Sequence, residues 1–72
     1  MLFKAKIRLY GEVHEIVHTG HLLDDATRII EKKCGPVHRP HIVGNKIVAE
    51  VELGYEVEAE IVSNRKLPER KH

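Results

Sequence analysis

The chain has 72 residues and a formal net charge of +1 at pH 7, with 42% hydrophobic and 32% charged residues. A chain of this length makes one small domain, which buries only about 60% of the surface that its unfolded form exposes. Its apolar runs are too short for a transmembrane helix or for the core of a secretory signal, so we expect no membrane partner. The small net charge also excludes a strong general attraction to nucleic acids or anionic lipids.

The single cysteine, Cys34, cannot form an internal disulfide, which predicts a reducing, cytoplasmic location. The chain has no Gln and only one Met, beside abundant Glu and Lys. Such a composition is typical of heat-adapted proteins, so a thermophilic source is one interpretation and chance in a short chain is the other.

Residues 2–10 predict a strand with one buried face, because apolar residues alternate with basic ones. The apolar positions are Phe3, Ala5, Ile7 and Leu9, and the basic positions between them are Lys4, Lys6 and Arg8. Gly11 and Glu12 predict a turn or bulge, followed by a second, less regular strand that ends near residue 18. One long strand bent at Gly11 is the alternative.

A helix is predicted over residues 21–34, where apolar side chains recur every three or four positions. Acidic residues stand in its first turn and lysines in its last, as the helix dipole favours. Thr19, or a residue one or two positions later, supplies the N-cap. Gly35 and Pro36 end the helix, because glycine suits a left-handed cap and proline cannot continue a helix.

The segment after the helix predicts a sheet edge. Pro36 and Pro40 exclude residues 36–41 from a central strand, because proline has no N–H to donate to a neighbouring strand. Residues 41–43 predict a short edge strand, and Gly44 with Asn45 predicts a two-residue hairpin turn.

Residues 47–61 carry the clearest pattern, because every odd position is apolar and five even positions are Glu. We call these five residues the acidic stripe: Glu50, Glu52, Glu56, Glu58 and Glu60. The segment is either one bent strand or a hairpin about Gly54. We favour a hairpin with a three-residue loop, because it keeps the apolar residues on one face. Its expected pairs are Leu53 with Val57, Val51 with Ala59, and Ala49 with Ile61.

These elements predict an α+β two-layer sandwich, in which one helix packs on a mainly antiparallel sheet of about four to five strands. The expected order along the chain is two strands, the helix and three strands. The domain covers residues 1–63, and residues 64–72 form a polar, basic and mobile tail.

The acidic stripe has three interpretations. Its carboxylates recur about every 6.5–7 Å along one side of a strand, and they repel one another unless something opposes them. The structural interpretation is a ladder of cross-strand ion pairs with Lys4, Lys6 and Arg8. The functional interpretations are a docking surface for a basic partner or a second copy, and an inhibitor surface that mimics an anion.

A nucleic-acid-binding surface is the main alternative, because sheet platforms for single strands combine positive charge with stacking aromatic rings. Its candidate residues are Lys4, Lys6, Arg8 and Tyr10 in the first strand, and Arg65, Lys66, Arg70 and Lys71 in the tail. The chain has only three aromatic residues, however, and adjacent glutamates would weaken the field that attracts phosphates. A solubilising end is the simpler interpretation of the tail.

Cys34, His38 and His41 are candidate metal ligands. Their spacing in a proline-constrained loop could place three ligands around Zn²⁺ and leave a fourth position to water. The sequence offers no nearby fourth ligand or general base, so chance proximity is the simpler interpretation. His14 and His18 lie about 13 Å apart along a strand, which is too far to share one ion.

Enzymatic catalysis is not expected. Ser63 is the only serine and lacks a nucleophile elbow, and the glycines form no phosphate-binding loop. Asp24 and Asp25 belong to the helix start, and nothing in the sequence fixes the geometry of a Cys34–His38 pair. We expect no catalytic residue and no cofactor.

The sequence therefore predicts a small non-enzymatic interaction module that self-associates, as a homodimer or another homo-oligomer, and binds a protein partner. One helix of about three turns covers only part of the predicted apolar sheet face, and small domains commonly offset such a deficit by oligomerising. Nucleic-acid binding is the first alternative, and a zinc site is the second.

Overall fold

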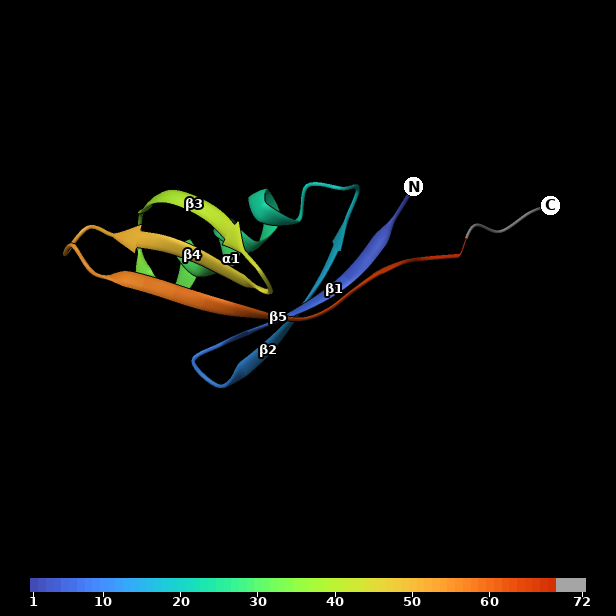
Figure 1. The fold of residues 1–72 in the computed structure, drawn as a ribbon, viewed down its shortest axis with the longest axis horizontal. Coiled ribbons are helices and arrows are strands. Elements are labelled where there is room, and N and C mark those ends of the chain that lie inside the picture. Colours follow the sequence, from blue (N-terminus) through green and yellow to red (C-terminus); the bar gives the residue numbers. More distant parts are fainter. Residues whose placement is uncertain (69–72) are drawn as a thin grey trace.

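The computed structural model describes residues 1–68, which form one helix and a single antiparallel sheet of five strands. The elements in chain order are β1 (Phe3–Leu9), β2 (Glu12–His18), α1 (Leu22–Cys34), β3 (Val37–Val43), β4 (Lys46–Val51) and β5 (Glu56–Lys66). The strand order across the sheet is β2-β1-β5-β4-β3, and α1 lies behind β3 and β4 in the view of Figure 1. The predicted α+β two-layer sandwich is confirmed.

The long strand β5 joins the two halves of the sheet. Residues 56–60 of β5 pair with β4, and residues 60–66 pair with β1. Within the described sheet, Glu60 alone pairs on both sides, with Arg8 of β1 and Lys46 of β4. In Figure 1 the hairpin of β3 and β4 lies at the left of the molecule, and the hairpin of β1 and β2 crosses β5 diagonally near the middle. The molecule is elongated, with extents of 51 × 22 × 20 Å.

A bulge at Val62 reverses the two faces of β5. Ile7 pairs with Ile61, but Lys6 pairs with Ser63, so Val62 is one extra residue in β5. Side chains alternate between the faces of a strand, and an extra residue therefore exchanges the faces for everything that follows. Asn64, opposite Ala5, consequently lies on the same face as the core residues, where it remains exposed but lies within hydrogen-bond distance of His18. Arg65, opposite Lys4, lies on the outer face.

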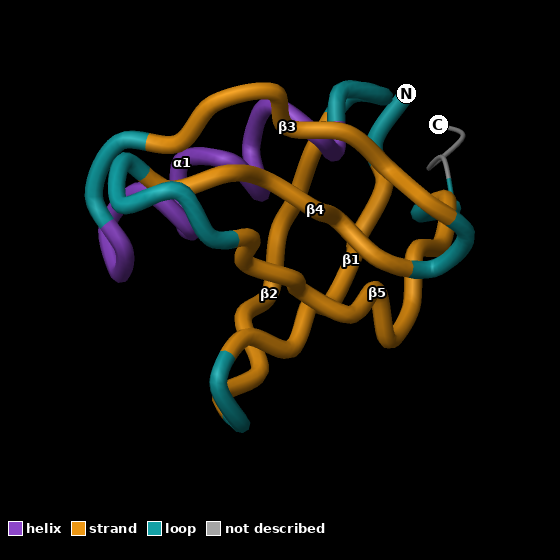
Figure 2. Tube along the Cα trace, turned by 60° about the vertical axis from the view of Figure 1, so that its left-hand side comes forward, coloured by secondary structure: helices purple, strands orange, loops and turns teal. Residues whose placement is uncertain are grey.

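The core lies between α1 and the inner face of the sheet. Alternate residues of the strands meet one side of the helix, where the three-four spacing of its apolar residues leaves a continuous stripe. The buried cluster consists of Ala5, Ile7, Leu9, Ile16, Leu22, Ala26, Ile30, Ile47, Val51, Val57 and Ala59. Figure 2 shows α1 running along this face beside β3 and β4.

His18 is a polar residue inside this core, with only 4% of its surface exposed. Its ring stacks on Phe3 with a centroid separation of 5.2 Å. The Gly20 N–H donates to His18 Nδ1 at 3.1 Å, and Nε2 lies 2.9 Å from Asn64 Oδ1. Because Nδ1 accepts, Nε2 carries the proton and donates to Asn64, so the ring is neutral and both nitrogens are satisfied.

The helix begins and ends close to its predicted bounds. Its N-cap is His21, without a side-chain cap hydrogen bond, so Thr19 does not cap it. The helix ends at Cys34, and Gly35 follows with φ +81°, a backbone angle that favours glycine. No described helix is long and apolar enough to cross a membrane.

The register of the last hairpin differs from the predicted one by four residues, because Val57 pairs with Ala49 and not with Leu53. Ala49 pairs with Val57 and Ile47 with Ala59, so the loop spans residues 52–55. A shift of four, like any even shift, keeps the same residues on the same face, which is why the alternation alone could not exclude it. The predicted inward position of Leu53 is wrong, because this side chain is 84% exposed in the loop.

Two strands are longer than predicted. The edge strand β3 begins at Val37, and a register shift between His38 and His41 accommodates Pro40. The strand β5 continues to Lys66, and the Leu67 N–H donates to the Leu2 carbonyl at 2.8 Å. The prediction of a mobile tail therefore fails for residues 64–66, because they pair with β1. Residues 69–72, including the predicted Arg70 and Lys71, lie outside the described residues.

A comparison of substitutions at Ile47 and Leu53 tests the observed register, which buries Ile47 and exposes Leu53. Ile47→Ala should lower the free energy of unfolding by about 2–5 kcal/mol, because the side chain is 0% exposed and leaves a cavity. Leu53→Ala is the matched control, and we expect a change within about 0.5 kcal/mol. Urea denaturation of the three proteins measures both effects, and equal losses for the two variants would contradict the register.

Candidate functional site

The outer face of the sheet, opposite the helix, carries positive charge at one end and negative charge at the other. Lys4, Lys6 and Arg65 lie at the end formed by β1 and the last part of β5. Glu50, Glu56 and Glu58 lie at the end formed by β4 and the first part of β5. The bulge at Val62 produces this segregation, because it turns Arg65 to the same face as the lysines.

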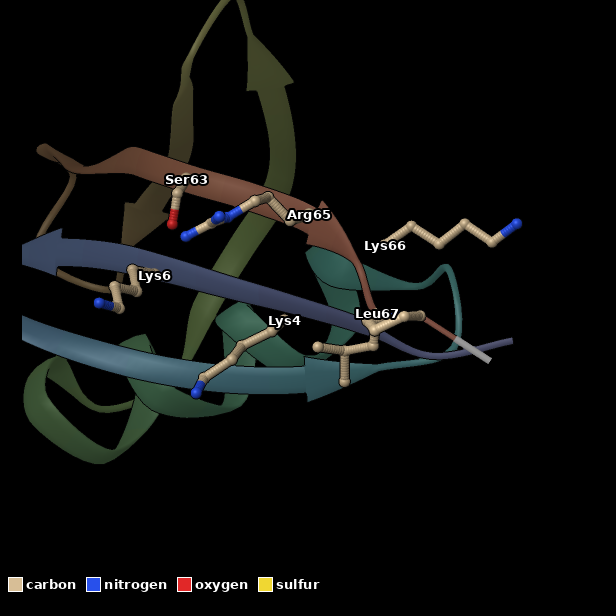
Figure 3. Close-up of a pocket in the computed structure, with 7 residues that line it drawn as sticks. Lys4, Lys6, Ser63, Arg65, Lys66 and Leu67 are labelled. Carbon is tan, nitrogen blue, oxygen red and sulfur yellow. The ribbon is translucent and has the colours of Figure 1, made fainter. Parts of the chain in front are cut away.

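The basic end contains a hollow of about 220 Å³, which we call the basic groove. Its lining residues are Lys4, Lys6, Ser63, Arg65, Lys66, Leu67 and Pro68. Lys4 lies directly opposite Arg65, and Lys6 lies directly opposite Ser63. Figure 3 shows Arg65 extending along β5 toward Ser63, whereas Lys66 points away from the other cations.

The basic groove keeps an excess of positive charge. Lys4 Nζ lies 3.6 Å from Glu15 Oε1, and Lys6 Nζ lies 4.0 Å from Glu15 Oε2, so one carboxylate is shared between two ammonium groups. Among residues 1–68, Arg65 forms no ion pair. Two like charges directly opposite each other are unfavourable, and Lys4 and Arg65 are such a pair.

The acidic end repeats this arrangement with the opposite sign. Glu50 lies directly opposite Glu56, and neither forms an ion pair with any residue that the structure describes. Glu58 lies 3.8 Å from Lys46 Nζ, and Glu60 lies 2.7 Å from Arg8 Nη1. Glu52, the remaining member of the acidic stripe, is exposed in the loop between β4 and β5.

The predicted ladder of ion pairs between the two stripes is therefore wrong for Lys4 and Lys6. Arg8 reaches Glu60, but the two lysines lie beside Ser63 and Arg65 instead. The reason is the length of β5, whose acidic residues pair with β4 before the strand reaches most of β1. Each end of the outer face consequently holds charges that the fold itself leaves poorly compensated.

Tyr10 does not line the basic groove, so the structure does not bring this ring together with Lys4, Lys6 and Arg65. It occupies the turn between β1 and β2, with φ +51°. Its hydroxyl lies 3.6 Å from Cys34 Sγ, within hydrogen-bond distance for sulfur. This hydrogen bond is the main cause that raises the pKa of Tyr10 above its usual 10.0, and desolvation and the negative charges of ionised Cys34 and Tyr55 add to it.

The structure does not bring the predicted metal ligands together. Within residues 1–68, no group of three His, Cys, Asp or Glu side chains could hold a metal ion. Cys34 faces Tyr10, whereas His41 Nδ1 lies 2.8 Å from the Arg39 carbonyl oxygen and His38 lies opposite Glu50. The strand conformation of residues 37–43 spreads these side chains, where the sequence suggested a folded loop.

A second hollow of about 590 Å³ lies on the helix side, at the start of α1. Its lining residues are Phe3, His18, Gly20, His21, Leu22, Leu23, Asp24, Ile42, Ile61 and Asn64. Both ring nitrogens of His18 are already engaged, so this buried residue offers no free polar group to a ligand.

Sequence reasoning missed Ser63 and Asn64, which it assigned to the domain end and the tail. The signal that could have found them is the break in alternation at Ile61 and Val62, where two apolar residues follow each other. Such a break is typical of a bulge.

No family model, curated protein or solved structure matches the chain.

The contact between Tyr10 and Cys34 can be tested by titration. The chain has two tyrosines and no tryptophan, so in a Tyr55→Phe background the phenolate absorbance reports Tyr10 alone. Cys34→Ala in this background should lower the pKa of Tyr10 toward its usual value, because the principal hydrogen bond is lost.

The contribution of this contact to the free energy of unfolding decreases at high pH. A raised pKa means that the fold favours the neutral phenol. The contact therefore contributes stability below pH 10.0, and this contribution disappears as the pH rises through the raised pKa. Titration curves that coincide with and without Cys34 would contradict the assigned contact.

Proposed function

We propose that the protein is a homotypic interaction module, in which two copies pack their outer sheet faces together. The basic groove of each copy lies on the acidic stripe of the other. The observation that carries this proposal is the pair of like-charge contacts at opposite ends of one face, Lys4 with Arg65 and Glu50 with Glu56. Each pair is unfavourable in the isolated chain, and the opposite end of a second copy compensates it.

A two-fold axis places each charged end of one copy on the oppositely charged end of the other. The basic and acidic ends lie on either side of Glu60, which belongs to both halves of the sheet. Rotation by half a turn about an axis between the two faces, passing near Glu60, exchanges the ends. Both contacts are then identical by symmetry, so the assembly closes as a dimer and does not extend into a fibre.

The same rotation brings β2 of one copy over β3 of the other. Val13 and Val17 lie on the outer face of β2, where they are 51% and 57% exposed. Val43 lies on the outer face of β3 and is 57% exposed. These side chains give the interface an apolar component at each end.

The size and composition of the face suit a salt-sensitive dimer. The molecule exposes 5279 Å² of surface, which is large compared with the roughly 800 Å² per partner that a stable interface buries. Exposed ion pairs contribute only about 0.2–1 kcal/mol each. The charges therefore set the orientation and salt dependence of the dimer, and its affinity stays modest.

Charge reversal at each end tests the proposal. Lys4→Glu with Arg65→Glu makes both ends acidic, and Glu50→Lys with Glu56→Lys makes both ends basic. Each double variant should be a monomer in sedimentation, whereas an equimolar mixture of the two should form a heterodimer. The wild type should be a dimer that dissociates as the salt concentration rises.

The matched control separates this geometry from a general attraction between opposite net charges. Arg28→Glu with Lys32→Glu changes the net charge by the same amount, but these exposed residues lie on α1, away from the outer face. This variant should remain a dimer and should not pair with the basic variant. A monomeric wild type in dilute salt, or a heterodimer formed equally well by the helix control, would overturn the proposal.

A further inference from the structure

We propose that the basic groove also binds the phosphate backbone of a single-stranded nucleic acid, in competition with the second copy. The binding itself depends only on the residues of the groove. Its competition with dimerisation rests on the proposed function, because the acidic stripe of a second copy would occupy the same surface.

The groove offers the chemistry that recognises phosphate. Arg65 presents a guanidinium without a carboxylate partner among residues 1–68, and such a group binds two phosphate oxygens at once. Lys4 and Lys6 add two ammonium charges that share the single carboxylate of Glu15. The Ser63 hydroxyl lies in the same hollow and can donate one more hydrogen bond.

A phosphate also relieves the repulsion that the fold creates. Lys4 and Arg65 are direct cross-strand neighbours, so an anion between them is attracted by both. The hollow of about 220 Å³ lies between β1 and the end of β5, with Leu67 and Pro68 beside it. Its lining belongs to β1, β5 and the residues that follow β5, so it presents no protruding helix of the kind that enters the major groove of a duplex.

The aromatic residues of the chain all lie elsewhere. Phe3 stacks on His18, Tyr10 lies beside Cys34, and Tyr55 belongs to the loop before β5. Bases therefore find no stacking platform at the groove, and binding should be weak and independent of base sequence. The acidic end of the same face repels the remainder of the strand, which confines the contact to the groove.

The salt dependence of binding follows from the number of cations. Lys4, Lys6 and Arg65 can each contact one phosphate, whereas Lys66 points away (Figure 3). Each contact with a single strand contributes about −0.7 to the slope of log K against log salt, so three contacts predict a slope of about −2. Removing one cation should reduce the slope to about −1.4.

Fluorescence anisotropy with short labelled DNA and RNA homopolymers measures this slope between about 50 and 200 mM salt. The protein should carry Glu50→Gln and Glu56→Gln, which remove the acidic contact of the dimer and leave the groove intact. In this background, Arg65→Gln should weaken binding and reduce the slope. The matched control Lys32→Gln, on the exposed face of α1, should leave both unchanged.

Every outcome of this experiment bears on the proposal. A slope near −2 that depends on Arg65 and is equal for different homopolymers supports it. Equal effects of Arg65→Gln and Lys32→Gln, a strong base preference, tighter binding to a duplex, or no binding in dilute salt would overturn it. If inorganic phosphate at the same ionic strength displaced the labelled strand completely, the ligand of the groove would be free phosphate and not a nucleic-acid strand, and the proposal would be overturned.

Competition is measured separately with the wild type. Added homopolymer should convert the dimer into a monomer bound to nucleic acid, and sedimentation detects the change in mass. A wild type that is already monomeric, but binds through Arg65, would contradict the proposed dimer and leave the groove assignment supported. A dimer that binds the homopolymer without dissociating would contradict the competition.

Discussion

The single extra residue at Val62 determines which side chains share a face of this protein. Before it, β5 presents glutamates to the outer face and apolar residues to the helix. After it, the alternation is reversed, so Asn64, itself exposed, hydrogen-bonds to the buried His18, and Arg65 joins Lys4 on the outer face. Without the bulge, Asn64 would lie on the outer face away from His18, and Arg65 would lie on the opposite face from Lys4. The buried hydrogen bonds of His18 and the basic groove are thus two consequences of one backbone irregularity.

The pairing of β5 also determines the distribution of charge on the outer face. A near-neutral chain acquires a face with two charged ends, because β5 pairs its acidic part with β4 and its basic part with β1. Ion pairs such as Arg8 with Glu60 neutralise the middle of the face, while the like-charge neighbours remain at its ends. A surface of this kind attracts its own copy in one orientation, and it attracts anions at one end. Both proposed activities follow from the same distribution of charge.

Much of the fold could be predicted from local patterns. Period-two alternation identified the strand beginning at Phe3 and the last hairpin, and helix-end signals placed α1 within one residue of its observed bounds. Registers could not be predicted, because any even shift, such as the observed one of four residues, preserves every face, and the alternation therefore predicts Leu53 in the core instead of the loop. The basic groove needs Ser63, predicted as the last residue of the domain, and Arg65 and Lys66, predicted as part of the tail, and no regular alternation runs through these residues. The candidate zinc ligands Cys34, His38 and His41 lie apart, because spacing along a chain does not specify whether a segment forms a loop or a strand.

The account depends most directly on the register of β1 against β5, and nuclear Overhauser contacts between the two strands measure it. The bulge predicts backbone contacts that join Ile7 with Ile61, Lys6 with Ser63, and Lys4 with Arg65. An uninterrupted register would instead join Lys6 with Val62 and Lys4 with Asn64. Observation of the second set would return Arg65 to the inner face, and the basic groove together with both activities assigned to it would be contradicted.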